Sequence, residues 1–302
     1  MQYYRIITTL VKPIIIMLGI GTVAAFLSPV LWSLTDGNYA LEKVFQKTAL
    51  LLLLLSAIFA RTKSSFTSTP DRISPDIRVD LKRLIIGWLT GIVILLIPLY
   101  LLILLKIRIL DSDALSLTNI THRATSAFGV GLIIGCIEEY IFRGWLLEWL
   151  LARLDKIQSI ARSLTIIASA FYFAILHFLK PQITPYPHSN TLTAGLDVLL
   201  RSLEHLFQHH DFDTLLALFL AGVFLALIKI RYNKGLMLVI GIHAGWVFSI
   251  KMTRALTDLN PSSQWRFLAG QDGITGYLSA SWLGLIVIGV ILLDHSIKKP
   301  HH

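Results

Sequence analysis

The chain has 302 residues, of which 55% are hydrophobic and 15% charged, with a mean hydropathy of +0.69. Soluble domains carry about 25% charged residues, so this composition excludes an ordinary soluble protein and predicts an all-α, polytopic membrane protein. The net charge is +9, but the basic residues lie mostly between apolar runs, where they set membrane orientation. We therefore expect the lipid bilayer, and no nucleic acid, as a partner. The single cysteine excludes an internal disulfide framework.

Apolar runs close to the length that crosses a bilayer, about 17 to 25 residues, recur along the chain. We place eight of them, at about 12–34, 44–60, 84–105, 126–151, 159–179, 212–230, 234–250 and 277–294. Because lipid offers no partner for backbone polar groups, each run is expected to be a helix. The first run is interpreted as a retained helix rather than a cleaved signal. The sequence thus predicts a bundle of about eight transmembrane helices, with residues 1–302 forming a single transmembrane domain.

The connectors between these runs differ in their content of lysine and arginine. Sixteen such residues fall on one side of the predicted bundle and ten on the other, which favours both termini in the cytoplasm. The connector 61–83 is then cytoplasmic and the connector 180–211 is not. In the second connector, leucines recur at helical spacing at Leu196, Leu199, Leu203 and Leu206. We expect a helix there that lies in the membrane interface, with simple packing favoured over a role as a lid.

Residues 136–144, CIEEYIFRG, place three charged side chains within an apolar run. An isolated ionised side chain at membrane depth costs roughly 2.5 to 3.5 kcal/mol, so these three must be paired or used. Glu139 and Arg143 are four residues apart and share a helical face, which predicts a buried ion pair. Glu138 is turned about 100° away from Glu139 and is a candidate general base, because a poorly solvated carboxylate gains affinity for protons. The alternative is that all three residues only hold helices together.

Two histidines interrupt later apolar runs. His177 lies in FYFAILHFL, one turn after Phe173, and His243 lies in VIGIHAGWVF. Either histidine alone would be read as a hydrogen-bonded packing residue. Together with the cluster at 138–143 they supply carboxylate, imidazole and guanidinium groups from three predicted helices, which is a set of groups typical of an active site.

The segments EEYIFR, FAILH and HAGWV resemble the EExxxR, FxxxH and HxxxN-type motifs of the CPBP family of intramembrane proteases, also called the Abi family. This family includes the type II CAAX prenyl endopeptidases and bacterial bacteriocin-processing or immunity proteins. The resemblance covers about residues 126–250, with the motifs in the family's order. It implies an eight-helix prenyl endopeptidase architecture and, since the bacterial members are the most similar, a location in the cell inner membrane.

The resemblance implies a role for each matched residue. Glu138 and His177 would activate a water molecule for attack on a peptide carbonyl, and His243 would stabilise the oxyanion. Structural support would come from Glu139, Arg143 and Phe173. The expected activity is that of an intramembrane endopeptidase.

The fourth position after His243 departs from the family pattern, because Val247 stands where Asn is usual. Valine donates no hydrogen bond, so a backbone amide, the indole N–H of Trp246 or another side chain must replace the donor, or else the oxyanion site is weakened. This departure leaves open a non-catalytic scaffold or an immunity-type pseudoenzyme. A transporter is disfavoured, because the sequence shows neither paired halves nor broken helices.

Glutamate with two histidines is also a set of zinc ligands, so a zinc-dependent version of the same protease stays open. The chain lacks the HExxH spacing, and we expect water activation without a metal or other cofactor. Cys136 offers a covalent alternative, but it lies two residues before Glu138 on a nearly opposite face, and we interpret it as a small packing residue.

The depth of the histidines in their runs bears on the substrate. His177 falls late in a run directed outward, and His243 falls past the midpoint of the run 234–250 in the same direction. We therefore expect the cavity to open nearer the non-cytoplasmic face. The expected partner is a membrane-tethered peptide or protein substrate, either lipidated or exported.

Overall fold

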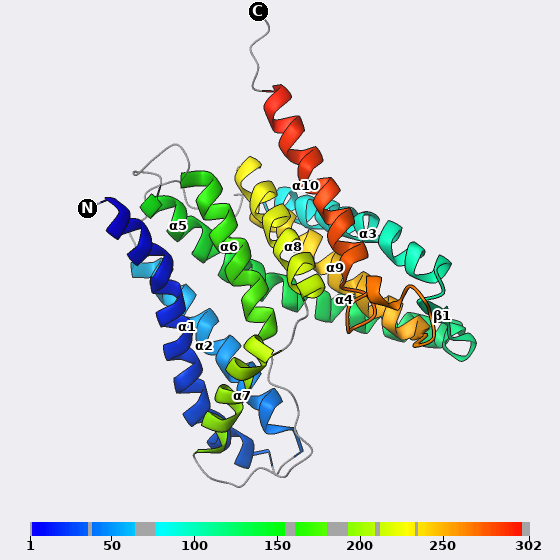
Figure 1. Ribbon diagram of the computed structural model, residues 1–302, viewed down its shortest axis with the longest axis horizontal. Helices are drawn as coiled ribbons and strands as arrows, with labels where there is room; N and C mark the ends of the chain where they lie inside the picture. Colours follow the sequence, from blue (N-terminus) through cyan, green and yellow to red (C-terminus); the bar gives the residue numbers. More distant parts are fainter. Residues whose placement is uncertain are drawn as a thin grey trace, which may run out of the picture. The chain divides into compact units, whose positions relative to one another are not determined.

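The computed structural model describes residues 2–35, 38–63, 76–154, 161–179, 193–208, 212–232 and 235–297. Within these ranges the chain is almost entirely helical (Figure 1). Most of the predicted cytoplasmic connector, from 64 to 75, and the first part of the predicted non-cytoplasmic connector, from 180 to 192, lie outside the described residues. The helical prediction is confirmed, and the fold is that of an all-α polytopic membrane protein.

The helices fall into two compact units. The first unit comprises residues 1–68 and 145–210, and the second comprises 69–144 and 211–302. The boundary falls inside a short π-helix, η2 (Tyr140–Leu146). The single domain predicted from the sequence stays a prediction.

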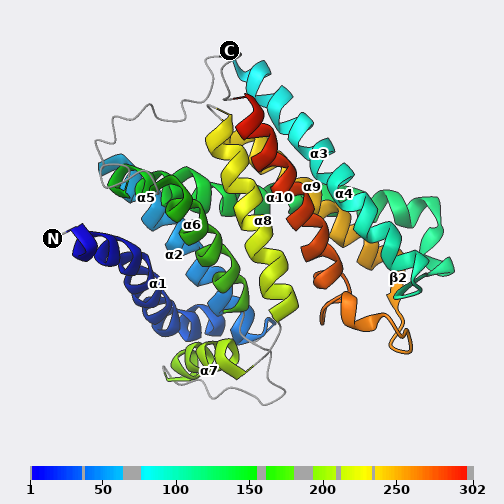
Figure 2. The same cartoon turned by 45° about the horizontal axis from the view of Figure 1, so that its top comes forward.

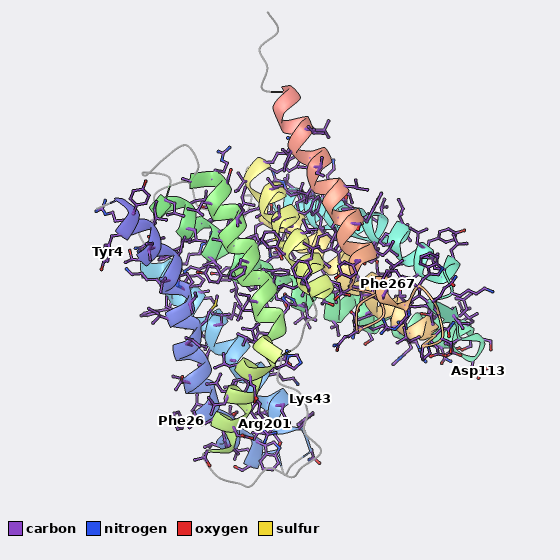
Figure 3. All side chains as sticks on the ribbon, in the orientation of Figure 1. Tyr4, Phe26, Lys43, Asp113, Arg201 and Phe267 are labelled. Carbon is purple, nitrogen blue, oxygen red and sulfur yellow. The ribbon has the colours of Figure 1, made fainter. Side chains whose placement is uncertain are left out.

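In the part of the first unit that the structure describes there are five helices. They are α1 (Gln2–Ser33), α2 (Leu41–Lys63), α5 (Leu147–Leu154), α6 (Ala161–Phe178) and α7 (Ala194–Gln208). Helices α1, α2 and α7 share one apolar core, formed by Ala24, Ala25, Leu41, Phe45, Ala194 and Val198. Phe26 on α1 is exposed, as is Arg201 on α7, and both are labelled in Figure 3.

The predicted helix in the connector 180–211 is α7, and its existence is confirmed. Its buried face is centred on Ala194, Val198 and Ser202, whereas the leucines at 196 and 199 are only partly buried. Gly195 explains why the small residues rather than the leucines face α1, because a Cβ there would lie 1.8 Å from the carbonyl oxygen of Ala25 on α1. The helix therefore packs on α1 through its small residues, while its location in a membrane interface stays a prediction.

Within the described residues, the second unit contains five long helices and a small cap. The long helices are α3 (Ile77–Leu104), α4 (Leu117–Glu139), α8 (Phe212–Arg231), α9 (Leu236–Leu256) and α10 (Tyr277–Ile297). The cap is formed by β1 (Arg108–Leu110), η1 (Ser112–Leu115), β2 (Thr257–Leu259) and η3 (Arg266–Leu268). Helices α3, α4 and α9 lie side by side, and α8 lies beside α10 (Figures 1 and 2).

All eight predicted runs coincide with helices. Within the described residues, six helices are long and apolar enough to cross a membrane: Tyr3–Ser33, Leu41–Arg61, Ile77–Leu104, Leu117–Leu154, Phe212–Arg231 and Leu236–Leu256. Two shorter apolar helices, Ala161–His177 and Tyr277–Leu293, match the fifth and eighth runs. The chain is therefore a multi-pass membrane protein.

Glycine pairs let α9 approach both of its neighbours closely. A Cβ on Gly87 or Gly91 of α3 would lie 2.2 Å from a carbonyl oxygen of α9, and a Cβ on Gly241 of α9 would lie 2.2 Å from a carbonyl oxygen of α3. On α4, a Cβ on Gly135 would lie 2.9 Å from the carbonyl oxygen of Ile240. Small residues four apart are a common means of close helix packing in membranes. They fix the distance between α4 and α9, on which the charged residues lie.

The cap is a feature that the sequence did not predict. Strands β1 and β2 pair antiparallel, with Arg108 opposite Leu259. The buried guanidinium of Arg108 donates to the hydroxyl oxygen of Thr257 at 2.6 Å and to its carbonyl oxygen at 2.7 Å. Phe267, labelled in Figure 3, is exposed on η3 within the same cap.

Two predicted boundaries are corrected. Helix α4 begins at Leu117, nine residues before the predicted run, with the hydroxyl oxygen of Ser116 accepting from the backbone N–H of Asn119 as its N-cap. Helix α9 continues to Leu256, beyond the predicted end at 250. In both cases polar residues at the end of a helix stay helical, although hydropathy excludes them from a membrane span.

Candidate active site

A buried ion pair lies where α4 passes into the π-helix η2. Arg143 Nη1 donates to Glu139 Oε1 at 2.8 Å, and both side chains are 0% exposed. Arg143 Nη2 also donates to the carbonyl oxygen of Gly222 on α8, at 3.1 Å. The predicted pair is thus observed. The wider turn of a π-helix is uncommon and occurs often at functional sites.

His243 is attached to the same carboxylate. Its Nδ1 lies 2.8 Å from Glu139 Oε1, and its side chain is 7% exposed. An ionised carboxylate only accepts hydrogen bonds, so this contact puts a hydrogen on Nδ1. Glu139 therefore orients the imidazole, a role that the resemblance alone did not assign to it.

Glu138 faces the other nitrogen of the same imidazole. Its Oε2 lies 3.8 Å from His243 Nε2, and its side chain is 19% exposed. With Nδ1 protonated, a neutral imidazole presents a lone pair at Nε2, which an ionised carboxylate at this distance would repel. A proton on either Nε2 or Glu138 removes this repulsion. The two groups can therefore share one exchangeable proton in a water-poor environment.

His177 is held by its own helix, α6. Its Nδ1 lies 2.8 Å from the carbonyl oxygen of Phe173, and the two rings are 4.5 Å apart at their centroids. A carbonyl oxygen only accepts, so Nδ1 donates and Nε2 is left as the basic nitrogen. Phe173 is buried and thereby fixes the orientation of the histidine, as expected of a supporting residue. Because His177 belongs to the first unit and Glu138 to the second, their convergence stays a prediction.

Trp246 lies one helical turn after His243, and the two ring centroids are 6.5 Å apart. The indole N–H is buried and has no hydrogen-bond partner among the described residues. Val247 is only half-buried. Of these two side chains, only that of Trp246 can donate a hydrogen bond.

Cys136 and metal binding are the remaining alternatives for the chemistry of the site. Cys136 is exposed, which corrects its interpretation as a packing residue. Position 136 faces away from the core of the second unit because Gly131, Gly135 and Glu139 take the buried face of α4. Among the described residues, no group of three or more His, Cys, Asp and Glu is arranged to hold a metal ion.

Sequence reasoning missed two members of the site. One is the carbonyl of Gly222, which ties Arg143 to α8; a backbone acceptor leaves no signal in side-chain chemistry. The other is the contact between Glu139 and His243, which depends on the close approach of α4 and α9. The glycines at 131 and 135, four residues apart on α4, are the sequence signal that could have indicated it, since a Cβ there would lie 2.7 and 2.9 Å from carbonyl oxygens of α9.

Comparison with known proteins bears on residues 121–249. This stretch matches the sequence profile of the family described as Type II CAAX prenyl endopeptidase Rce1-like. The matched stretch includes every residue named above as catalytic or supporting, so the resemblance stated from the motifs is confirmed. The family is one of endopeptidases, so the match supports a peptide hydrolase at the level of the family. No curated protein and no solved structure matches the chain.

Proposed function

We propose that this protein is an intramembrane endopeptidase that hydrolyses a peptide bond of a membrane-tethered, lipidated or exported peptide, using a water molecule activated by Glu138 with His177. The observation that carries the proposal is the arrangement of two carboxylates on the two nitrogens of one imidazole, at 2.8 and 3.8 Å, inside membrane-spanning helices. Charged groups at this depth are costly and are retained where they have a function. The family match over 121–249 supplies the reaction class.

The reaction follows from the positions of the exchangeable protons. Glu138 takes a proton from water held between its carboxylate and the basic nitrogen of His177, and the hydroxide oxygen attacks the carbonyl carbon of the substrate. The carbonyl oxygen becomes an oxyanion. Protonated Glu138 then gives its proton to the amide nitrogen as the carbon–nitrogen bond breaks, which leaves a carboxylic acid and an amine.

His243 acts on the oxyanion rather than on the water. Glu139 accepts from its Nδ1 and fixes the ring, so that a hydrogen carried on Nε2 points away from the supporting carboxylate. A donor that is already oriented in a water-poor cavity stabilises developing charge more than a mobile one does. Arg143 neutralises Glu139 and anchors the pair to α8. These two residues are positioning residues.

The membrane and the side of access are part of the proposal. The distribution of lysine and arginine favours both termini in the cytoplasm, and the resemblance to bacterial members favours the inner membrane. In α9, which is longer than the predicted run, His243 precedes the midpoint of the helix. The expectation of a site nearer the non-cytoplasmic face then rests on His177 alone. Reporter fusions within the connector 180–211 test it, and a cytoplasmic signal there would reverse the proposed access.

The test of function is cleavage by purified protein in lipid nanodiscs. Three peptides are compared: a farnesylated peptide ending in a CAAX sequence, the same peptide without the lipid, and a peptide anchored by a transmembrane segment. Wild-type protein is expected to cleave at least one, and Glu138→Gln is expected to cleave none, since the amide cannot accept the proton of water. Glu204→Gln, at an exposed position of α7, is the matched control.

Two outcomes of this assay contradict the proposal. Equal cleavage by wild type and Glu138→Gln would remove Glu138 from the chemistry. Absence of cleavage by either protein, with a cellular function that survives Glu138→Gln, would favour a non-catalytic scaffold. A chelator arm addresses the cofactor: we expect no loss of rate, and loss that zinc restores would indicate the zinc-dependent version.

A further inference from the structure

The oxyanion of the proposed reaction needs a second donor. Tetrahedral intermediates in acyl transfer are stabilised by oriented hydrogen-bond donors, and His243 provides one. The side chain four residues later on α9 is Val247, which has no donor. A donor must therefore come from another group on the same part of α9 or from a neighbouring helix.

Trp246 has an indole N–H suited to this role. Residues three and four after His243 flank the same helical face, so 246 and 247 both border the imidazole. The Nε1 atom of Trp246 is buried, and no described residue accepts a hydrogen bond from it. A buried donor without an acceptor carries a desolvation cost, and such a group calls for a functional explanation.

Other tryptophans of the second unit make the contrast clear. Trp282 Nε1 donates to the carbonyl oxygen of Ile94 at 2.7 Å, as expected of a tryptophan that only joins two helices. The indole N–H of Trp88 is buried without a partner in the described residues, but its ring lies against Phe128 and Phe248. Trp246 alone of these three has its ring beside His243, at 6.5 Å between centroids.

The ring of Trp246 is also held in place. Phe224 of α8 packs against it, with centroids 5.8 Å apart, and the residue is only 7% exposed. The preceding residue, Gly245, packs closely on α3: a Cβ added to it would lie 2.3 Å from the carbonyl oxygen of Trp88. The indole therefore sits on a tightly packed stretch of α9. A donor fixed in this way needs no reorganisation when charge develops.

We propose that the indole N–H of Trp246 donates to the oxyanion beside His243, and so replaces the side-chain donor that position 247 does not supply. This inference rests on the proposed function. Trp246 is then a catalytic residue, because it contacts the reacting oxygen. A neutral indole makes this hydrogen bond without adding a charge to the membrane interior.

The experiment removes the N–H and keeps an aromatic side chain. Trp246→Phe is expected to lower kcat by about 10²–10³-fold with KM unchanged, because the donor acts only on the transition state. Adding Val247→Asn to that variant is expected to recover at least part of kcat, since asparagine supplies an N–H from the neighbouring position. Trp88→Phe is the matched control, as it also loses a buried N–H without a partner, and it is expected to keep the wild-type kcat.

Several results would overturn the inference. They are a wild-type kcat for Trp246→Phe, a loss confined to KM, or no recovery in the double variant. If Trp246→Phe does not fold, benzothienylalanine at position 246 replaces the N–H by sulfur at almost constant shape, and wild-type turnover by that protein would contradict the proposal. The proposed function and the role of Trp246 can fail separately. An active Glu138→Gln variant would contradict both. An inactive Glu138→Gln variant together with a fully active Trp246→Phe variant would contradict only the role of Trp246.

Discussion

Two arginine–carboxylate pairs of the second unit have almost the same geometry and opposite surroundings. Arg143 and Glu139 are 2.8 Å apart with both side chains 0% exposed, whereas Arg254 and Asp272 are 2.7 Å apart with side chains 49% and 29% exposed. Distance therefore does not distinguish them. The first pair is surrounded by long apolar helices, and the second joins the last turn of α9 to the loop that precedes α10.

The difference in burial implies a difference in purpose. Exposed pairs contribute about 0–1 kcal/mol, so the pair of Arg254 with Asp272 adds little beyond tying its loop to α9. A buried pair is weak evidence for stability in itself, because desolvation offsets the attraction, yet breaking it leaves one charge uncompensated. The buried pair also orients His243, whereas Asp272 accepts from the backbone N–H groups of Ile274 and Thr275. One pair supports a site and the other supports a turn.

The largest effect on stability is expected from Arg143→Ala. This change leaves the carboxylate of Glu139 buried without its guanidinium partner and should destabilise the protein by about 3–5 kcal/mol. Thermal unfolding in detergent, followed by circular dichroism, measures it. A midpoint equal to that of the wild type would mean that the pair carries no more weight than an exposed one.

A smaller loss is expected from Gly91→Ala on α3. The new Cβ would meet the carbonyl oxygen of Ile242 at 2.2 Å, and overpacking of this kind costs about 1–3 kcal/mol. Because α9 would have to move, the contact of His243 with Glu139 should loosen and peptide cleavage should slow as well. Gly129→Ala on α4 is the matched control, since nothing lies within 4 Å of its Cβ. Equal unfolding midpoints for the two variants would exclude close packing as the reason for the glycine.

The smallest effect is expected from Arg254→Ala in the exposed pair. Loss of that contact should change the free energy of unfolding by about 1 kcal/mol or less and leave peptide cleavage unchanged. The same unfolding and cleavage assays apply. A loss as large as that of Arg143→Ala would show that the exposed pair stabilises the second unit as much as the buried one.

Hydropathy was sufficient to predict the helices but not their ends. All eight runs are helical because apolar length alone requires it. Residues 118–123, TNITHR, and Lys251 to Leu256 are too polar for a membrane span, yet they continue α4 and α9 because helix geometry persists beyond the hydrocarbon. The strands β1 and β2 are three residues each and pair across a long sequence separation, so neither has a recognisable local pattern.

The site was predictable in its residue types and only partly in its contacts. The pair of Glu139 with Arg143 follows from a separation of four residues on one helix. The contact of Glu139 with His243 joins two helices, and it depends on backbone distances set by Gly131 and Gly135 rather than on the polar residues themselves. The placement of His177 beside Glu138 depends on both units and stays a prediction.

A double-mutant cycle on Glu138 and His177 tests the convergence of the catalytic groups most directly. The value of kcat/KM is measured for wild type, Glu138→Gln, His177→Ala and the double variant on the best-cleaved peptide. If both groups hold the same water, each single change loses nearly as much as the double change, because residues that act as a unit are strongly non-additive. Losses that simply multiply would contradict a shared water molecule, and with it the proposed mechanism.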